Sequence, residues 1–153
     1  MARALAVSAD IVNPAVVMDD SRLWCKKFVY IIRASRKQSR NKLGQRYKDG
    51  GSRIIYIGVT AKLGKGRPSS TLARIAEKAF HELHGVRRLS IHLVKCEPRQ
   101  HVETWKQLES ALIRKFEILF NHRPYYNETS GAKPVARKQF ADKRLESVIR
   151  GLS

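Results

Sequence analysis

The most informative acid in this chain is Glu109, because it stands where an apolar residue is expected. The segment Val102 to Phe120 predicts a helix with apolar residues on one side, and Glu109 falls about 40° from Trp105 on that side. A carboxylate on an apolar face is strongly unfavourable unless it is paired, protonated or bound to a cation. Two interpretations of Glu109 are therefore open: a buried ion pair with a residue such as Arg, or a metal ligand.

Three basic side chains share one face of an earlier predicted helix. This helix is expected over residues 70–84, with Gly85 ending it. Arg74, Lys78 and His81 are spaced i, i+4, i+7 and lie on the side opposite the apolar stripe. Such a face can bind phosphate groups, or it can simply be a solvated polar face.

Two tyrosines lie in predicted strands. The runs FVYII over residues 28–32 and RIIYIGVT over 53–60 are rich in apolar, aromatic and β-branched residues, and they contain Tyr30 and Tyr56. A phenolic hydroxyl at the end of a strand can position or deprotonate water, or it can belong to ordinary sheet packing. A third strand, LSIHLVKC, is expected over residues 89–96 because its apolar and polar residues alternate.

These elements predict an α/β protein of the α+β type, with a small three-stranded, mainly antiparallel sheet flanked by helices. The length of 153 residues suits one domain. We expect an N-terminal arm over 1–24, the domain itself over 25–130 and a basic appendage over 131–153. Within the appendage, residues 135–152 predict an amphipathic helix that packs on the sheet or lies on DNA.

The charge of the chain indicates a polyanionic partner. Lys and Arg number 31 against 13 Asp and Glu, giving a formal net charge of +18. A hydrophobic content of 42% excludes a disordered polycation, and no apolar run approaches the roughly 18 residues of a membrane span. Nucleic acid is the usual partner of such a charge. A basic structural protein, such as a ribosomal one, is the alternative from composition alone.

Part of this charge is concentrated in two segments that we expect to contact DNA. Residues 33–53 carry eight Lys or Arg against the single acid Asp49 and form either a phosphate-tracking flap that orders on nucleic acid or a solvated insertion. Residues 61–70 form the second segment. The expected DNA contacts in the two segments are Arg36, Lys37, Arg40, Lys42, Arg46, Lys62, Lys65 and Arg67.

The two cysteines and the N-terminus bear on the compartment. Cys25 and Cys96 are far apart and outside any CxxC pair, so neither a disulfide framework nor a zinc site is predicted. Residues 1–20 lack the apolar core of a secretory signal. We expect a protein that is not secreted, in the cytoplasm of a bacterial or phage-infected cell.

Taken together, the motifs resemble the GIY-YIG nuclease family. The resemblance runs from residue 28 to residue 127 and rests on Phe28-Val29-Tyr30, Tyr56-Ile57-Gly58, Arg74, Glu109 and Asn127, in that order. The first motif has Phe and Val where the family has Gly and Ile. The long interval between the two tyrosines resembles the insertions of the restriction-enzyme branch.

The resemblance implies a role for each of four side chains. Glu109 would be the single protein ligand of Mg²⁺ or Mn²⁺, and Arg74 would stabilise the phosphate oxygens. Tyr30 would help to deprotonate water, and Tyr56 would position the water or the phosphate. The task of Tyr30 requires a lowered pKa, which a nearby lysine or metal-bound water would supply.

Further residues complete this expected site. Lys78 or Lys62 would lower the tyrosine pKa, and Gly58 would allow a close approach at the end of its strand. Asn127 would orient the sheet and the active-site residues through its amide. Lys78 stands where many family members carry His or Tyr, so either Lys78 or His81 would be the fourth functional group.

The function implied is a metal-dependent endonuclease that hydrolyses phosphodiester bonds in double-stranded DNA. A restriction, phage or mobile-element enzyme is expected, and double-strand cutting would suggest a homodimer on DNA. The alternative is a non-catalytic nucleic-acid-binding protein, including one that binds RNA.

Overall fold

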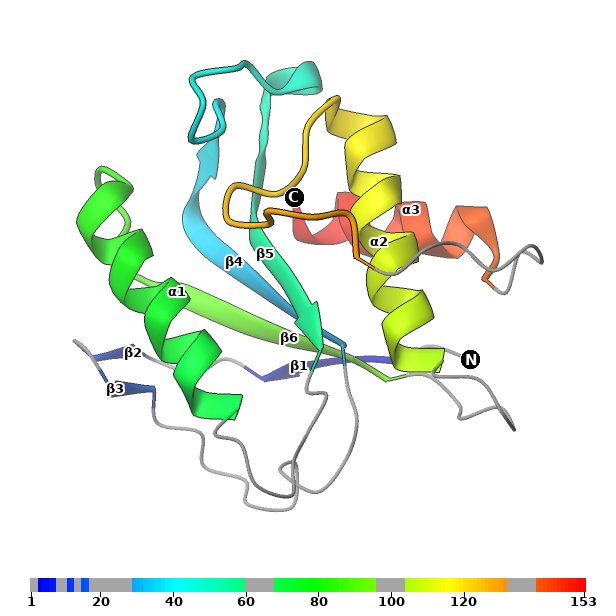
Figure 1. The fold of residues 1–153 in the computed structure, drawn as a ribbon, viewed down its shortest axis with the longest axis horizontal. Helices are drawn as coiled ribbons and strands as arrows, with labels where there is room; N and C mark the ends of the chain where they lie inside the picture. The colour runs from blue at the N-terminus through cyan, green and yellow to red at the C-terminus, as the bar shows by residue number, and fades with distance from the viewer. Residues whose placement is uncertain are drawn as a thin grey trace.

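Four antiparallel strands form the central sheet of the computed structural model (Figure 1). Their order is β1 (Arg3–Val7), β6 (Leu89–Lys95), β4 (Val29–Gln38) and β5 (Ser52–Val59). The short strands β2 (Ile11–Val12) and β3 (Ala15–Val16) pair separately. The structure describes residues 3–7, 11–12, 15–16, 29–59, 68–95, 104–131 and 140–153. The expected α+β class and the antiparallel arrangement of the three predicted strands are confirmed, while β1 adds a fourth strand from the expected arm.

Strand β4 is longer than its hydropathy predicts. We expected it to end near residue 32, but it continues to Gln38, because Arg33 pairs with Ile54 and Ser90 and Gln38 pairs with Ser52. Backbone hydrogen bonds from both neighbouring strands sustain this extension, although its side chains are polar. The expected insertion over 33–53 is therefore a strand followed by a connection over 39–51, which includes the short helix η2 (Lys48–Gly50).

The connection is itself folded. Arg40 and Arg46 form a β-bridge, and Tyr47 is buried, with its N–H donating to the carbonyl of Ser39 at 2.9 Å. The Tyr47 hydroxyl donates to the carbonyl of Arg123 at 3.0 Å. The basic hairpin thus has a defined conformation, held by the β-bridge and by the contacts of Tyr47. That it orders on nucleic acid stays a prediction.

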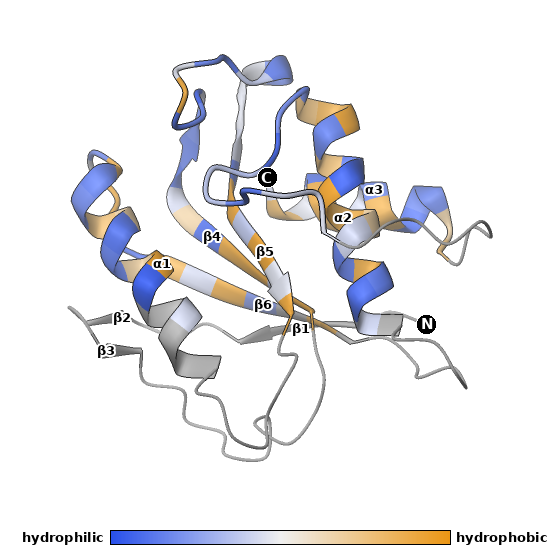
Figure 2. Cartoon of the chain, in the orientation of Figure 1, coloured by the Kyte–Doolittle hydropathy of each residue, from blue (hydrophilic) through white to orange (hydrophobic). Residues whose placement is uncertain are grey.

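Helix α1 (Pro68–Glu82) covers one face of the sheet (Figure 1). Its buried residues share a cluster with one side of the strands, and Figure 2 shows apolar colour along β4, β5 and β6. This cluster comprises Tyr30, Ile32, Ala34, Ile55, Ile75, Ala76, Ala79, Leu83, Val86, Leu89, Ile91 and Tyr126. Helix α1 begins two residues before the predicted start and also ends two residues early.

Helices α2 (Thr104–Phe120) and α3 (Asp142–Leu152) pack on the opposite face. Ile149 of α3 is fully buried, and the ammonium of Lys115 on α2 pairs with Asp142 at 2.7 Å and Glu146 at 3.6 Å. These contacts dock α3 on α2, and α3 also contacts β5. Of the two placements expected for the C-terminal helix, packing on the domain is the observed one. The helix begins at Asp142, and the expected residues 135–139 lie outside the described part.

The regular pairing of β4 with β5 places Tyr56 on the same side of the sheet as Tyr30, since Tyr30 lies opposite Gly58 and Ile32 lies opposite Tyr56, and a β-bulge follows. Ile32 pairs with Tyr56, whereas the next residue, Arg33, pairs with Ile54. Ile55 is therefore the extra residue, and both Ile55 and Tyr56 contact the cluster under α1. A bulge commonly redirects a side chain beside a functional site, and here it turns Ile55 to the side of the sheet that carries the two tyrosines.

Candidate active site

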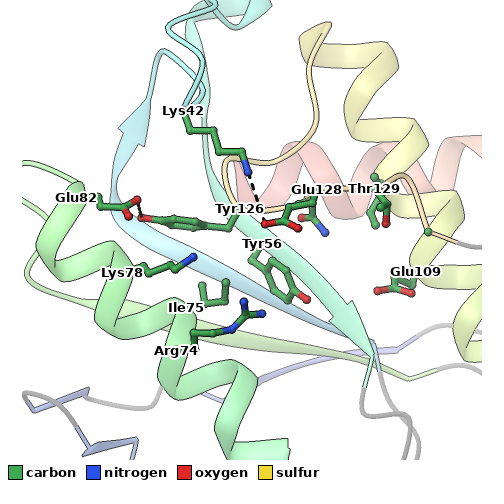
Figure 3. A pocket seen from close by; sticks show the side chains of 13 residues that line it. Lys42, Tyr56, Arg74, Ile75, Lys78, Glu82, Glu109, Tyr126, Glu128 and Thr129 are labelled. Carbon is green, nitrogen blue, oxygen red and sulfur yellow. Dashed lines mark hydrogen bonds and ion pairs between the residues drawn. The ribbon is translucent and has the colours of Figure 1, made fainter.

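A cavity of about 290 Å³ opens beside β5, between α1 and α2 (Figure 3). It is lined by Lys42, Tyr56, Arg74, Ile75, Lys78, Glu82, Glu109, Ile113, Tyr126, Asn127, Glu128, Thr129 and Gly131. Five parts of the chain supply these residues: the β4–β5 hairpin, β5, the two helices and the loop that follows α2. The fold thus gathers five of the seven expected site residues around one space.

Arg74 and Lys78 of α1 face Glu109 of α2 across the cavity, with Tyr56 between them in Figure 3. Both cationic side chains are exposed, so they can reach a ligand without first breaking an ion pair of the core. His81 is exposed and does not line the cavity. Of the two residues expected as the fourth group, Lys78 is the one at the site.

Glu109 sits at the margin of the buried face of α2 and is half-buried. Burial raises the pKa of its carboxyl to about 7, and the charge of Lys106, one turn earlier, only partly opposes this shift. A carboxylate held in a tight ion pair would show the opposite shift. The raised pKa therefore argues against the buried-ion-pair interpretation of Glu109 and leaves this acid available to a cation in the cavity.

Tyr30 and Tyr56 form a pair in which only Tyr56 lines the cavity. Their ring centroids are 5.9 Å apart, and their hydroxyls form a hydrogen bond with each other. Burial raises the pKa of both phenols, and the cation that opposes it is Arg74. The lowering of the Tyr30 pKa by Lys78 that the sequence suggested is not found. Lys62, the other expected cation, lies outside the described residues.

Gly58 makes room for this tyrosine pair. Gly58 is directly opposite Tyr30 in the sheet, and a Cβ atom built on it would lie 2.7 Å from the Tyr30 hydroxyl and 2.6 Å from the ring of Tyr56. Contacts this short do not occur for real Cβ atoms. The glycine of the YIG sequence is thus a packing requirement of the two tyrosines.

Asn127 joins the loop after α2 to the edge of β5. Its side-chain oxygen accepts the N–H of Ile57 at 2.9 Å, and its side-chain nitrogen donates to the carbonyl of Ile57 at 2.8 Å. The N–H of Tyr126 donates to the carbonyl of Ile55 at 2.8 Å. The loop therefore continues the hydrogen bonding of the sheet, and the amide of Asn127 holds the backbone between the bulge and Gly58 in place.

Eight lining residues were not expected at the catalytic site from the sequence, and four of them form two contacts across it. The Tyr126 hydroxyl donates to Glu82 at 3.1 Å, which ties the loop to α1, and Lys42 lies 3.9 Å from Glu128. Glu82 continues the spacing of Arg74 and Lys78 by a further four residues, a signal that was present in the sequence. The position of Lys42 at the cavity depends on how the hairpin packs, and no local sequence pattern predicted it.

The expected DNA-contacting residues divide into two groups. Arg36, Lys37, Arg40, Lys42 and Arg46 are all exposed on the end of β4 and the hairpin, and Lys42 also lines the cavity. Lys62, Lys65 and Arg67 lie outside the described residues. The hairpin thus presents a basic surface that begins at the cavity.

Among the described residues, no group of three or more His, Cys, Asp or Glu side chains is placed to hold a metal ion. A hydrated Mg²⁺ does not need such a group, because it keeps several waters and binds through one or two carboxylates. Glu109, half-buried and facing an open cavity, fits that requirement. In the same part of the chain, no helix is long and apolar enough to cross a membrane.

Comparison of the chain with family models, curated proteins and solved structures finds no match. The site is therefore interpreted from its own geometry.

Proposed function

We propose that this protein is a divalent-metal-dependent endonuclease that hydrolyses phosphodiester bonds in double-stranded DNA. The observation that supports this best is the convergence of Tyr56, Arg74, Lys78 and Glu109 on one cavity. Together they offer a group to position water, two cations for phosphate oxygens and a carboxylate for a metal. The motif resemblance to GIY-YIG nucleases belongs to the same proposal.

Each group has a task that its surroundings suit. Arg74 binds phosphate oxygens through its planar fork of donors, and Lys78 adds a second positive charge one turn along α1. Tyr56 contacts the attacking water or the phosphate, since its hydroxyl faces the cavity, and Tyr30, which does not line the cavity, forms a hydrogen bond with it. Asn127 keeps Tyr56 in position through the backbone of Ile57.

Glu109 would hold Mg²⁺ or Mn²⁺ in this proposal. Such an ion, when bound, makes coordinated water more acidic and neutralises charge that develops on the phosphate. Glu109 must be deprotonated to bind it, so a carboxyl with a pKa of about 7 ties metal affinity to pH near neutrality.

The basic hairpin fits DNA as the substrate. Exposed Arg40 and Arg46 flank the tip, and Lys42 connects this surface to the cavity. These charges can neutralise phosphates of a duplex without reading its sequence. Because the described part of each chain has one cavity with this set of side chains, cutting both strands calls for a homodimer on DNA. A restriction or phage enzyme in the cytoplasm of a bacterial or phage-infected cell is the setting that we propose.

Cleavage of supercoiled plasmid tests the proposal. The wild type should nick or linearise plasmid with Mg²⁺ or Mn²⁺ and not with EDTA, and Glu109→Ala should lose this activity. Glu77→Ala is the matched control, because Glu77 is an exposed acid on α1 that does not line the cavity. Metal-dependent cleavage that Glu109→Ala retains would exclude Glu109 as the ligand.

A second measurement separates metal binding from cleavage. Mg²⁺ should raise the Tm of the wild type and of Glu77→Ala, but not that of Glu109→Ala, because a ligand that binds the folded state stabilises it. Failure to cleave DNA or RNA under any condition, with tight binding to either, would favour the non-catalytic nucleic-acid-binding alternative.

A further inference from the structure

A second cavity, of about 280 Å³, lies beside the candidate active site between the hairpin tip and the segment that follows α2. The two cavities share Lys42 and Asn127 as lining residues. Leu43, His122 and Tyr125 also line the second cavity. The proposed function assigns no role to this space or to these three side chains.

Leu43 is exposed at the tip of the hairpin, with 75% of its surface accessible. The tip is nevertheless held by hydrogen bonds. The Asn41 side-chain oxygen accepts the N–H groups of Leu43 and Gln45, each at 3.0 Å, and the N–H of Gly44 donates to the carbonyl of Asn41 at 3.0 Å. A single exposed leucine is ordinary on a protein surface. This one projects from a hydrogen-bonded turn beside the cavity.

The other side of the cavity carries two half-buried rings. Tyr125 packs against Tyr126 with ring centroids 4.8 Å apart, and His122 packs against Tyr47 at 6.0 Å. Both rings remain partly exposed. Aromatic rings of this kind provide stacking surfaces for nucleobases without regard to sequence.

We propose that this second cavity receives an unstacked nucleobase of the DNA substrate, while Leu43 takes the vacated place in the base stack. The inference rests on the proposed function for its substrate. Apolar wedges, leucine among them, are a common means of separating base steps, and neighbouring cations offset the loss of stacking. A cavity near the lower end of ligand-site volumes, about 300–1,000 Å³, suits one base.

A base held in this cavity would position the DNA backbone at the candidate active site. Because Lys42 and Asn127 line both cavities, a base held in the second one would fix the adjoining phosphate near Arg74 and Glu109. Substrate preference would then follow from how easily a base leaves the stack, which is least costly at unpaired or mismatched positions.

Binding to matched duplexes tests the inference without any cleavage. Glu109→Gln in EDTA would be titrated with a labelled duplex containing one unpaired base and with the same duplex fully paired, by fluorescence anisotropy. The bulged duplex should bind about tenfold more tightly, within the range that one base–aromatic stack supplies. Adding Leu43→Ala should reduce this preference to less than about twofold.

Matched variants make the test specific to the cavity. Ile118→Ala removes a similarly exposed aliphatic side chain, 69% accessible, from α2, and it should leave the preference unchanged. Tyr125→Leu should lower the preference, and Tyr125→Phe should retain it because the ring remains. Circular dichroism would show that all variants are folded.

Three results would overturn the inference: equal affinity for the two duplexes, a preference that Leu43→Ala leaves intact, or an equal effect of Ile118→Ala. A preference found only with bulged RNA would overturn the choice of DNA. These outcomes do not by themselves support or refute the proposal that the protein is a nuclease. A Leu43-dependent preference without plasmid cleavage would sustain the base site and refute the nuclease, whereas metal-dependent cleavage without the preference would do the reverse.

Discussion

The hydroxyls of Tyr30 and Tyr56 form a hydrogen bond with each other, and of these two residues only Tyr56 lines the cavity. Tyr30 is 4% exposed and lies on the strand next to that of Tyr56. Under the proposed function, Tyr56 would be the phenol that meets the substrate and Tyr30 the group that orients it. The motif resemblance instead implies that Tyr30 helps to deprotonate water.

Conservative variants of the tyrosines should therefore differ. Tyr56→Phe should lower kcat by about 10²–10⁴-fold, as expected for loss of a group that contacts the reacting atoms, while Tyr30→Phe should cost less. Single-turnover plasmid cleavage measures both. Tyr47→Phe is the control, since it removes a buried hydroxyl outside the cavity. Complete inactivity of Tyr30→Phe beside an active Tyr56→Phe would return the role in proton transfer to Tyr30.

Arg74 should matter for cleavage more than for binding. Arg74→Ala should lower kcat by at least about 10²-fold, because a donor aimed at developing charge is lost, with little change in affinity. The net charge of +18 leaves many other phosphate contacts. Cleavage rate and anisotropy-based Kd would be compared with Arg87→Ala, an exposed arginine between α1 and β6. A large loss of affinity from Arg74→Ala alone would contradict this role.

Gly58 should not tolerate a methyl group. Gly58→Ala should lower the free energy of unfolding by about 1–3 kcal/mol and impair cleavage, because the two tyrosine rings must move. Gly151→Ala provides a contrast, since a Cβ there meets no atom within 4 Å, and it should stabilise α3 by about 0.5–1 kcal/mol. Urea unfolding would measure both. Equal stability of Gly58→Ala and the wild type would refute the packing account.

Loss of the Asn127 amide should loosen the loop from β5. Asn127→Ala should cost about 1–3 kcal/mol, because the N–H and carbonyl of Ile57 lose their partners at a buried position. Asn127→Asp should also be destabilising, since a carboxylate cannot donate to the Ile57 carbonyl. Thr129→Ala, an exposed change in the same loop, should have little effect on urea unfolding. Full stability of Asn127→Asp would show that the donated bond is unimportant.

The carboxyl of Glu109 should make stability depend on pH. Its pKa is raised from 4.5 to about 7 in the folded state, so the folded protein binds the proton more tightly than the unfolded chain. This group therefore lowers stability progressively as pH rises from 4.5 to 7, and the full cost remains above pH 7. Solvent screening at this half-open position limits the cost to about 1–2 kcal/mol.

Glu109→Gln should remove that dependence. In EDTA, the variant should be more stable than the wild type at pH 8 and equal to it at pH 4, as measured by urea unfolding. Glu77→Gln, at an exposed site, should follow the wild type at both values. A stability difference at pH 4 as large as that at pH 8 would mean that packing, rather than ionisation, distinguishes the variant.

Hydropathy patterns in the sequence determined the main elements of the fold. The 3.6-residue period of α1 and α2 and the apolar runs of β4, β5 and β6 reflect which residues of each element are buried. This pattern can be recognised without knowing which other element packs against it. The same pattern singled out Glu109, because a carboxylate beside Trp105 contradicts it. The net charge likewise indicated a polyanionic partner, because it follows from composition and does not depend on how the chain folds.

Tertiary structure alone decided which side chains meet. Strand β4 continues through Arg33 to Gln38 because its neighbours supply backbone hydrogen bonds that hydropathy does not register. The rotation of α1 about its own axis brings the side chains of Lys78 and Glu82 to the cavity and leaves that of His81 outside it.

Contacts between residues far apart in the chain were likewise decided only by the tertiary structure. The pairing of β4 with β5 places Tyr30 beside Tyr56, and the packing of the hairpin against the loop after α2 creates the cavity beside Leu43. Such contacts depend on distances between elements far apart in the chain. Local periodicity contains no information about those distances.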